Sequence, residues 1–316
     1  MPTGWYAVAR SAELRPGGVL RCRYFEDEWV LYRTKGGTPR LVGAYCPHLG
    51  AHLGHGGVVQ GENLRCPFHG FCYDTDGVCA STPYGTLPAA STRLTTTPLS
   101  ERNGLLLAWY DADHREPTWE VPELDMQGWS PLACRRYELP SHPQETTENS
   151  VDFGHLTEVH DFRAAEPGEL ETEGPLLRSR FAIEQPMAWA GLSFVTTKVE
   201  LDVYVWGLGY SLVEAFIPRF GIRIREFILP IPLDRDSIHL RVASSIRYFK
   251  GGALTVPLAR MILWGTFQVL CKEVESDIPV WTHKAYVDPP ALAKGDGPVG
   301  PYRRWARQFY PEFDDG

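Results

Sequence analysis

The sequence predicts an α+β protein with two domains, and three observations lead to this prediction. Short β-type runs separated by Gly and Pro turns occupy the first third of the chain. A polar stretch interrupted by prolines follows over 111–122 and is typical of a linker. Beyond it, β-rich segments over about 177–249 precede a long helical stretch over about 253–277. We therefore expect one domain over 1–115 and a second over 116–316.

Length and composition are compatible with this division. The chain has 316 residues, and hydrophobic residues make up 43% of them, so well-buried cores are expected. The net charge of −8 disfavours nucleic acid as a partner. There is no apolar run of the roughly 20 residues that a membrane span requires, and no signal-peptide pattern follows Met1. We therefore expect no transmembrane segment and a cytoplasmic location.

The first domain is expected to be all-β, and the second to combine helices with a large sheet. In the first domain we predict strands over 5–9, 19–24, 28–33, 41–45 and 104–110. In the second, a helical stretch near 143–160 precedes the β-rich segments, and the long helix follows them. A sheet between two helical stretches is an α+β arrangement, although periodicity alone does not fix its topology.

Two cysteine–histidine pairs, Cys46-Pro-His48 and Cys66-Pro-Phe-His69, carry the first chemical signal. Two thiolates and two imidazoles can hold a 2Fe-2S cluster with one iron on sulfur and the other on nitrogen. Structural zinc is the alternative for closely spaced Cys and His residues, but it more usually shows C-x2-C pairs. Both pairs lie in Gly- and Pro-rich loops, which allow close backbone approach to a cluster. The pattern therefore favours an iron–sulfur cluster.

These residues closely resemble the Rieske family. High-potential Rieske proteins join one extra cysteine from each loop in a disulfide. Here Cys72 follows the second pair, but Ala51 stands at the matching place in the first, so that disulfide cannot form. This departure resembles the low-potential Rieske domains of oxygenases. The remaining cysteines are interpreted as reduced core residues of an intracellular protein: Cys22, Cys79, Cys134 and Cys271.

The second signal is the pattern N-x2-D-x2-H-x4-H over Asn149, Asp152, His155 and His160. On one helix these side chains would lie within about 140° of the circumference, among apolar neighbours. A buried Asp beside two His is costly unless something pairs with it, and a metal ion would do so. Satisfied core polar groups are the alternative. Because the two His would lie about 140° apart, the helix must either bend, which Gly154 would ease, or end near His160.

A third metal ligand must come from elsewhere, and the last helical stretch offers Glu273, Glu275 and Asp277. Asp277 lies about 40° from the centre of the apolar stripe, whereas Glu275 lies about 120° away and Glu273 lies at its edge. Asp277 is therefore the acid that we expect to point inward, with a helix cap or a surface acid as the alternative. Pro279 is expected to end the helix. The stripe consists of Leu263, Phe267, Leu270 and Val274.

Two His and one carboxylate with open positions form the facial triad of non-heme Fe(II) oxygenases. Together with the Cys/His pairs, the pattern resembles the terminal oxygenase component of Rieske non-heme iron oxygenases over nearly the whole chain. The resemblance implies a helix-grip catalytic domain and a homotrimer in which electrons cross between subunits. It implies an aspartate, Asp152, that bridges to a cluster histidine of a neighbouring subunit, with Asn149 near the iron. It also implies two ligand sets: Cys46, His48, Cys66 and His69 for the 2Fe-2S cluster, and His155, His160 and Asp277 for a mononuclear Fe(II).

The implied reaction uses O2 and electrons to hydroxylate, demethylate or desaturate a C–H bond. The chain carries no dinucleotide fingerprint, so a separate reductase or ferredoxin is expected. The segments 275–281, 295–298 and 302–305 resemble members that act on steroids, namely ketosteroid hydroxylases, cholesterol 7-desaturases and bacterial sterol demethylases. A large apolar substrate, a sterol or steroid, is therefore expected. Further large side chains could line its pocket or fill the core: Met187, Trp189, Phe194, Tyr204, Trp206, Tyr210 and Phe216.

Two other functions stay open at this point. An O- or N-demethylase of small aromatic compounds would share the metals and topology, and would differ in the size of its pocket. A Rieske ferredoxin that only carries electrons would need the first domain alone, and it would leave roughly 200 residues and the second metal pattern without a role. The number of irons separates a ferredoxin from an oxygenase, because a ferredoxin holds only the two irons of its cluster and an oxygenase holds three.

Overall fold

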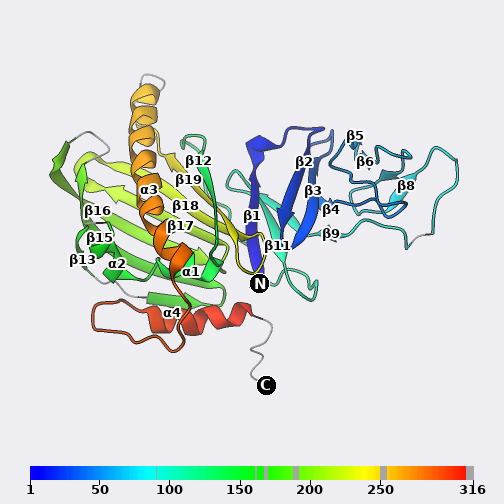
Figure 1. Cartoon of the computed structure of the whole chain (residues 1–316). Coiled ribbons are helices and arrows are strands. Elements are labelled where there is room, and N and C mark those ends of the chain that lie inside the picture. Colours follow the sequence, from blue (N-terminus) through cyan, green and yellow to red (C-terminus); the bar gives the residue numbers. More distant parts are fainter. Residues whose placement is uncertain (90, 161, 167–169, 188–191, 250–254, 311–316) are drawn as a thin grey trace. The chain divides into compact units, whose positions relative to one another are not determined.

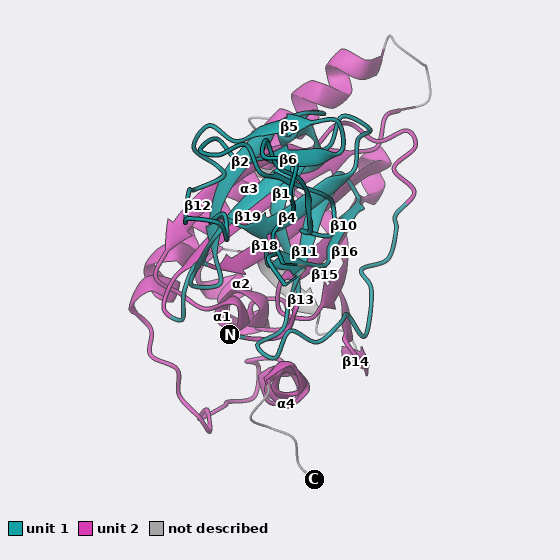
Figure 2. Cartoon of the chain, turned by 90° about the vertical axis from the view of Figure 1, so that its right-hand side faces the viewer, with its two compact units in different colours: residues 1, 5–124, 233–235 teal, residues 2–4, 125–232, 236–316 magenta. Residues whose placement is uncertain are grey.

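The computed structural model describes residues 1–316 except 90, 161, 167–169, 188–191, 250–254 and 311–316. The chain forms two compact units (Figure 2). Unit 1 contains residues 5–124 and 233–235, and unit 2 contains residues 2–4, 125–232 and 236–316. The division falls after Leu124, and the predicted domain boundary at 115/116 stays a prediction. In the described part of the chain, no helix has the length and apolar character needed to cross a membrane.

Unit 1 is all-β, as predicted, and contains three small sheets. The first has the order β1 (Gly4–Arg10), β11 (Leu105–Tyr110), β10 (Leu99–Arg102). The second has the order β2 (Val19–Tyr24), β3 (Asp27–Arg33), β4 (Pro39–Gly43), β9 (Thr96–Thr97). The third has the order β5 (Val58–Gln60), β6 (Asn63–Arg65), β7 (Cys72–Tyr73), β8 (Cys79–Ser81). A short 3-10 turn, Ser11–Glu13, follows β1.

The five predicted strands of unit 1 are all present, to within two residues at each end. The strands that sequence reasoning missed, β5 to β10, are two to four residues long, so they show no alternation that could be recognised. They are held by packing instead, because one buried core joins β3 and β4 to the third sheet. That core includes Val30, Leu53, Leu64 and Tyr73 together with Cys46 and Cys66.

The stretch 111–122 has neither helix nor strand, as expected of a connection, but it packs firmly against unit 1. The indole N–H of Trp5 donates to the carbonyl oxygen of Trp119 at 2.8 Å. Asp111 and Val121 are buried, and Asn103 donates to the carbonyl oxygen of Pro122 at 3.0 Å. The connection is therefore an ordered part of unit 1 and not a free linker.

Unit 2 is built on an eight-stranded antiparallel sheet crossed by one long helix (Figure 1). The sheet has the order β12-β19-β18-β17-β16-β15-β13, and β14 pairs with β15. The helix α3 (Val256–His283) buries Leu263, Phe267, Leu270 and Val274, the stripe expected from the sequence. Those side chains pack against strand residues in two hydrophobic clusters. This is the expected helix-grip arrangement. Its strands are β12 (Ala133–Leu139), β13 (Arg163–Glu166), β14 (Leu170–Glu173), β15 (Leu176–Met187), β16 (Leu192–Trp206), β17 (Tyr210–Ile217), β18 (Ile222–Pro232) and β19 (Ile238–Ile246).

The helical stretch expected near 143–160 is two short helices, α1 (Pro143–Glu148) and α2 (Phe153–Glu158). Asp152 caps the start of α2, because its carboxylate accepts the N–H of His155 at 3.2 Å. Gly154 lies within the first turn of α2 and does not bend the helix. The prediction of one continuous helix face was therefore wrong, whereas the expected end of the helix near His160 is present.

The prediction that Pro279 ends the long helix was also wrong, because α3 continues to His283. Proline removes one helical hydrogen bond and crowds the preceding turn, at a cost of about 3 kcal/mol. Here it lies in the last turns, between the buried side chains of Asp277 and Trp281. Burial of the indole of Trp281 offsets this cost, so tertiary packing overrides the local signal. The short helix α4 (Val299–Ala306) then follows, with a 3-10 turn at Arg307–Phe309.

The connection before α4 packs closely against the break between α1 and α2. Gly297 has a φ of +89°, and a Cβ there would lie 2.1 Å from the carbonyl oxygen of Val151. Gly221 also has a positive φ, +64°, but a Cβ there would meet nothing within 4 Å. A comparison of alanine substitutions at the two glycines therefore separates the free-energy cost of backbone strain from that of a steric clash.

We expect Gly297→Ala to lower the free energy of unfolding of unit 2 by about 3 kcal/mol, because strain and a backbone clash add. Gly221→Ala should cost only about 1 kcal/mol, from the left-handed conformation alone. Equilibrium urea unfolding followed by circular dichroism measures both. Equal losses in the two variants would show that the 295–298 segment does not restrain the break.

Candidate metal centres

The two Cys/His loops of unit 1 have the same backbone geometry. In each loop the cysteine N–H donates to the carbonyl oxygen five residues later, and a glycine N–H donates back to the cysteine carbonyl oxygen. Gly50 and Gly70 have φ values of +73° and +69°, which only glycine adopts readily. The bonds are Cys46 to Ala51 at 2.8 Å, Gly50 to Cys46 at 2.9 Å, Cys66 to Phe71 at 2.8 Å and Gly70 to Cys66 at 3.2 Å.

The four predicted cluster ligands lie together at the end of these loops. Cys46 and Cys66 are buried, whereas the rings of His48 and His69 are partly exposed, with centroids 4.8 Å apart. Burial raises the pKa of the Cys66 thiol, and the backbone N–H groups of Phe68 and His69, which point at its sulfur, oppose that shift. An inner pair of sulfurs and an outer pair of imidazoles fits a 2Fe-2S cluster with mixed ligands.

Two aromatic residues support this ligand set. Phe71 stacks on the ring of His48 with centroids 4.2 Å apart and so restrains the imidazole. The hydroxyl of Tyr73 lies 3.1 Å from the sulfur of Cys46. Burial, and then the hydrogen bond with Cys46, raise the pKa of Tyr73, so the phenol keeps its proton and donates to a thiolate. In the described part of the chain Cys72 forms no disulfide, and Ala51, at the matching place in the first loop, offers no sulfur for one.

In unit 2 the structure brings His155, His160 and Asp277 together. One ligand atom from each lies within 4.8 Å of the others, and Nε2 of His160 is 3.3 Å from Oδ1 of Asp277. The three residues come from α2, from the chain just after it, and from the buried face of α3. Two imidazoles and a carboxylate in a partly buried site are the donor set that ferrous iron takes with open positions.

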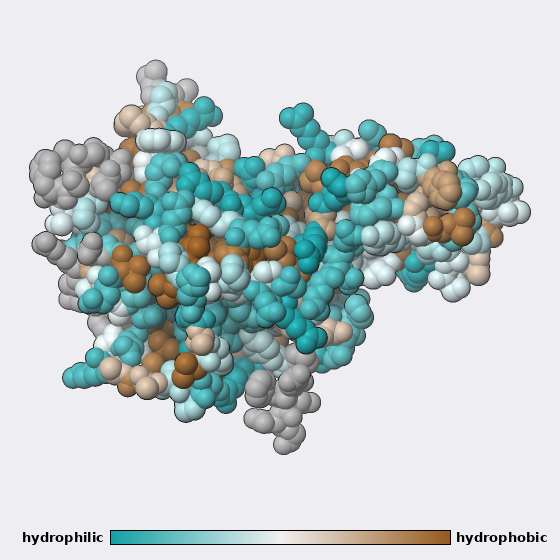
Figure 3. Space-filling view, viewed as in Figure 1, coloured by the Kyte–Doolittle hydropathy of each residue, from teal (hydrophilic) through white to brown (hydrophobic). Residues whose placement is uncertain are grey.

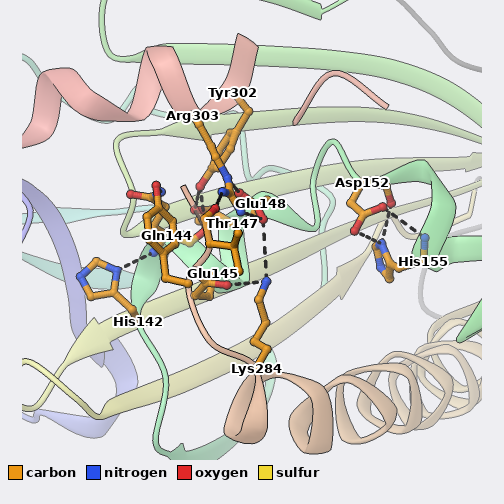
Figure 4. A network of polar contacts seen from close by, with 12 residues as sticks. His142, Gln144, Glu145, Thr147, Glu148, Asp152, His155, Lys284, Tyr302 and Arg303 are labelled. Carbon is orange, nitrogen blue, oxygen red and sulfur yellow. Dashed lines mark hydrogen bonds and ion pairs between the residues drawn. The ribbon is translucent and has the colours of Figure 1, made fainter. Parts of the chain in front are cut away.

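The orientation of His155 is fixed by Asp152 (Figure 4). Nδ1 of His155 lies 2.5 Å from the carbonyl oxygen of Asp152, so Nδ1–H donates there and Nε2 carries the free lone pair. Burial lowers the pKa of His155, which favours the neutral imidazole that binds metal. The structure therefore prepares this ring for a ligand role through a backbone contact that the sequence pattern did not reveal.

The other polar residues that the sequence offered for this site, Asn149, Glu273 and Glu275, have three different positions. The amide of Asn149 donates to Oδ2 of Asp277 at 3.2 Å, so it holds the carboxylate in place. Glu275 points away from the triad and pairs with Arg135 at 3.0 Å. Glu273, in contrast, faces the cavity described below. Asp277 is thus the acid of α3 that meets the two histidines.

Sequence reasoning missed a charged network around α1 (Figure 4). Glu148, at the end of α1, makes two hydrogen bonds with Arg303 of α4, at 2.6 and 2.9 Å, and both side chains are largely buried. Lys284, just after α3, contacts Glu145 and lies 3.7 Å from Glu148. The hydroxyl of Tyr302 donates to the carbonyl oxygen of Gln144 at 2.8 Å. These contacts tie α1, and with it the segment that carries Asn149, to the C-terminal elements.

A mostly apolar cavity, part of it open to solvent, lies beside the triad between α3 and the sheet. His160 and Asp277 form part of its wall. Trp189 and Phe194 lie outside the residues whose side chains are described. Of the large side chains that could line a pocket or fill the core, five are not part of the cavity lining: Met187, Tyr204, Trp206, Tyr210 and Phe216. The lining is mostly aliphatic and includes Leu156, Phe181, Ile183, Val199, Leu201 and Ile224.

Comparison with known proteins agrees with this architecture. Residues 4–91 match the Rieske 2Fe-2S domain, and residues 108–310 match the 3-ketosteroid 9α-hydroxylase C-terminal domain. Cholesterol 7-desaturase of Bombyx mori is 32% identical over 98% of this chain and 70% of its own length. The oxygenase component of 3-ketosteroid-9-alpha-monooxygenase of Rhodococcus rhodochrous is 25% identical over 99% of this chain and 84% of its own length. The structure of dicamba monooxygenase bound to dicamba has the same fold, with a TM-score of 0.75 and 21% identity over 97% of this chain and 96% of that one.

A Rieske domain joined to a sheet domain gripped by one long helix defines the terminal oxygenase class of enzymes. Within that class, the chain belongs to the Rieske non-heme iron oxygenases whose catalytic domain is of the 3-ketosteroid 9α-hydroxylase type. It is an oxidoreductase with a Rieske 2Fe-2S domain. A protein that only carries electrons is excluded, because the match over 108–310 covers the catalytic domain.

We expect Tyr73→Phe to lower the reduction potential of the cluster by about 40 mV, since it removes one hydrogen bond of about 1 kcal/mol to a ligand sulfur. Tyr32→Phe is the matched control: Tyr32 belongs to the same core, but its hydroxyl donates to the carbonyl oxygen of Asp74. Redox titration followed by electron paramagnetic resonance gives both potentials. An unchanged potential in the Tyr73 variant would contradict the role of its hydroxyl.

Proposed function

We propose that this enzyme uses O2 to oxidise a C–H bond of a sterol or steroid, by hydroxylation, demethylation or desaturation. The observation that carries the proposal is the cavity beside the triad. Hydrophobic side chains from α3 and from several strands of the sheet line it, and part of it is open to solvent. Its aliphatic lining suits a large hydrocarbon better than a small aromatic compound. The relatives that are named for cholesterol and 3-ketosteroids support the same substrate class.

In this proposal His155, His160 and Asp277 hold the iron, and Asn149 keeps the carboxylate oriented by its hydrogen bond of 3.2 Å. Iron bound by two imidazoles and one carboxylate supplies open positions at which O2 is activated with electrons from the cluster. The chain itself supplies the orientation of the substrate. Apolar side chains of the sheet and α3 surround the hydrocarbon and exclude water, while the wall formed by His160 brings it beside the metal.

Electrons are proposed to enter at the cluster held by Cys46, His48, Cys66 and His69, from a separate reductase or ferredoxin. Apolar side chains are exposed on and near the cluster loops, and Figure 3 shows hydrophobic surface at that end of unit 1. Leu49 is 65% exposed and Phe68 is 63% exposed. Exposed apolar side chains of this kind, next to partly exposed imidazoles, suit a surface on which another protein docks.

We further propose a homotrimer in the cytoplasm, in which Asp152 links a cluster histidine of one subunit to the iron site of the next. One carboxylate oxygen of Asp152 caps α2, and the side chain is 35% exposed, so the other oxygen can accept a hydrogen bond from a second subunit. Its carbonyl oxygen binds His155 directly. Asp152 is therefore placed to connect a partner to a ligand of the iron.

The proposal is tested first by His160→Ala. We expect the unmodified enzyme to contain the two irons of the cluster and one at the triad, and the variant to lose only the last. The visible absorption of the cluster should stay, while turnover of a sterol panel with a surrogate reductase should disappear. His283→Ala, at the exposed end of α3, is the control and should keep iron content and turnover.

Product mass spectrometry then identifies the substrate class. Sterol or steroid products that contain one added oxygen, lack a methyl group or carry a new double bond would support the proposal. Turnover of small aromatic ethers or amines, with no steroid product, would replace it by the demethylase function. Full sterol turnover by the His160 variant would remove the triad from the mechanism.

The bridging role is tested by Asp152→Ser, because serine caps a helix as well as aspartate but lacks the carboxylate. We expect both metal centres to stay loaded and the oxidation of the pre-reduced cluster in a single turnover to slow by about tenfold or more, since a charge-assisted hydrogen bond is lost. Glu158→Ala, an exposed acid on the same helix, should oxidise at the unmodified rate. A fast Asp152 variant would count against the bridge.

A further inference from the structure

Two acidic side chains face the apolar cavity without a protein partner. Glu226 comes from β18 and Glu273 from α3, and both line the cavity. Among the described residues, neither carboxyl has a hydrogen bond or an ion pair, and the cavity lining contains no Lys or Arg. Nothing in the chemistry of the triad uses them. Their presence inside the cavity therefore needs an explanation of its own.

The strand register places Glu226 in a small polar area of the sheet. It pairs with Val213 on β17 and with Ser244 on β19, so these three side chains share one face. Ser211 lies two residues before Val213 on that face and lines the cavity. The hydroxyls of Ser211 and Ser244 are buried and lack a hydrogen-bond partner in the described part of the chain. Polar groups without partners thus gather at one place in the wall.

On α3, Glu273 lies one turn before Asp277, on the side of the helix that faces the cavity. The four residues from Glu273 to Asp277 correspond to a rise of about 6 Å along the helix axis. Burial raises the pKa of Glu273, and the neighbouring carboxyls of Glu226 and Asp277 raise it further. The polar area is therefore adjacent to the metal triad but displaced from it along α3.

Such an arrangement is costly in the absence of a ligand. The two carboxyls are half-buried, and a polar group that lies against an apolar wall without a protein partner loses part of its hydration, a cost that an aliphatic residue at either position would avoid. Burial raises the pKa of Glu226 to about 7, which shows how poorly the cavity solvates a charge there. In ligand sites, a few polar groups in an apolar wall fix the orientation of the bound molecule. A substrate group is therefore the missing partner.

The hydrogen-bond donors and acceptors of Glu226 and Glu273 indicate which kind of substrate group would pair with them. Two carboxyls offer four acceptor oxygens and at most two protons, so the area is rich in acceptors. A hydroxyl both donates and accepts, so it pairs with a carboxyl in either protonation state, whereas a ketone only accepts and leaves the unprotonated carboxyl oxygens without a donor. An ammonium ion also donates, but the surrounding aliphatic wall favours a neutral molecule. A hydroxyl group satisfies both conditions.

We propose that Glu226 and Glu273 form a subsite that hydrogen-bonds a hydroxyl group of a polycyclic substrate, and that this bond selects which C–H bond faces the metal. The inference rests on the proposed function and deepens it. The hydroxyl is held about one helical turn from Asp277, so the oxidised carbon lies at a fixed distance from the oxygen substituent. Hydroxyl-bearing sterols are then preferred over their ketones and their deoxy analogues.

The experiment measures binding by isothermal titration calorimetry of the iron-loaded protein with four probes solubilised in cyclodextrin. They are cholesterol, cholest-4-en-3-one, cholest-5-ene, which lacks the hydroxyl, and 3β-aminocholest-5-ene. The unmodified protein should bind cholesterol at least about tenfold more tightly than cholest-5-ene or the ketone, as one hydrogen bond to a carboxyl provides. In Glu226→Leu and Glu273→Leu this preference should disappear, with cholest-5-ene bound as tightly as before.

Glu200→Gln, an exposed acid on β16, is the control and should keep the preference for cholesterol. Folding is checked by urea unfolding, in which Glu226→Leu should be at least as stable as the unmodified protein because a half-buried carboxyl without a protein partner is removed. An unchanged preference in a stably folded Glu226→Leu overturns the subsite and leaves the proposed function intact. Tighter binding of the amine than of cholesterol overturns the hydroxyl assignment. Absence of binding for all four probes overturns the proposed function, and the subsite with it.

Discussion

The packing of α3 across the sheet is the constraint on which the rest of unit 2 depends. Its apolar stripe, from Leu263 to Val274, is buried against the strands, and the helical repeat then turns Asp277 inward. A carboxylate in that position requires hydrogen-bond donors. Asn149 and His160 lie against it, so the segment that carries them has to return to α3. The metal triad is thus a consequence of where a hydrophobic helix lies.

The return of that segment explains why α1 and α2 are short. A single helix over 143–160 would place His155 and His160 about 140° apart, too far around the axis for one metal. The break at 149–152 and the end of α2 before His160 remove this conflict. The buried pair of Glu148 and Arg303 holds α1 in place, and loss of either partner would leave an uncompensated charge. The helical stretch is therefore interrupted where the positions of the two histidines require it.

Much of the fold and of the candidate site could be predicted from local patterns in the sequence. The spacing of the Cys/His pairs, the apolar stripe of α3 and the inward position of Asp277 are properties of short segments. The pairing of Glu148 with Arg303 has no local signal, because 155 positions separate them. The break before α2 did have a local signal in the sequence, since Asp152 is a favourable helix cap. Glu226 also had a local signal: it shares one face of β18 with Ile224 and Ile228, and an acid on an otherwise apolar face is unusual.

The acids of α3 show how one helix face can carry two different chemistries. Glu273 and Asp277 are neighbours on the helix surface, where two negative charges four residues apart repel each other. Asp277 has an amide and an imidazole beside it, which compensate part of its negative charge, and a cation would complete the proposed site. Glu273 has an aliphatic wall and another acid, which raise its pKa and favour its protonated form. Charge is therefore concentrated at the metal, while the adjacent turn offers a neutral polar group to a neutral substrate.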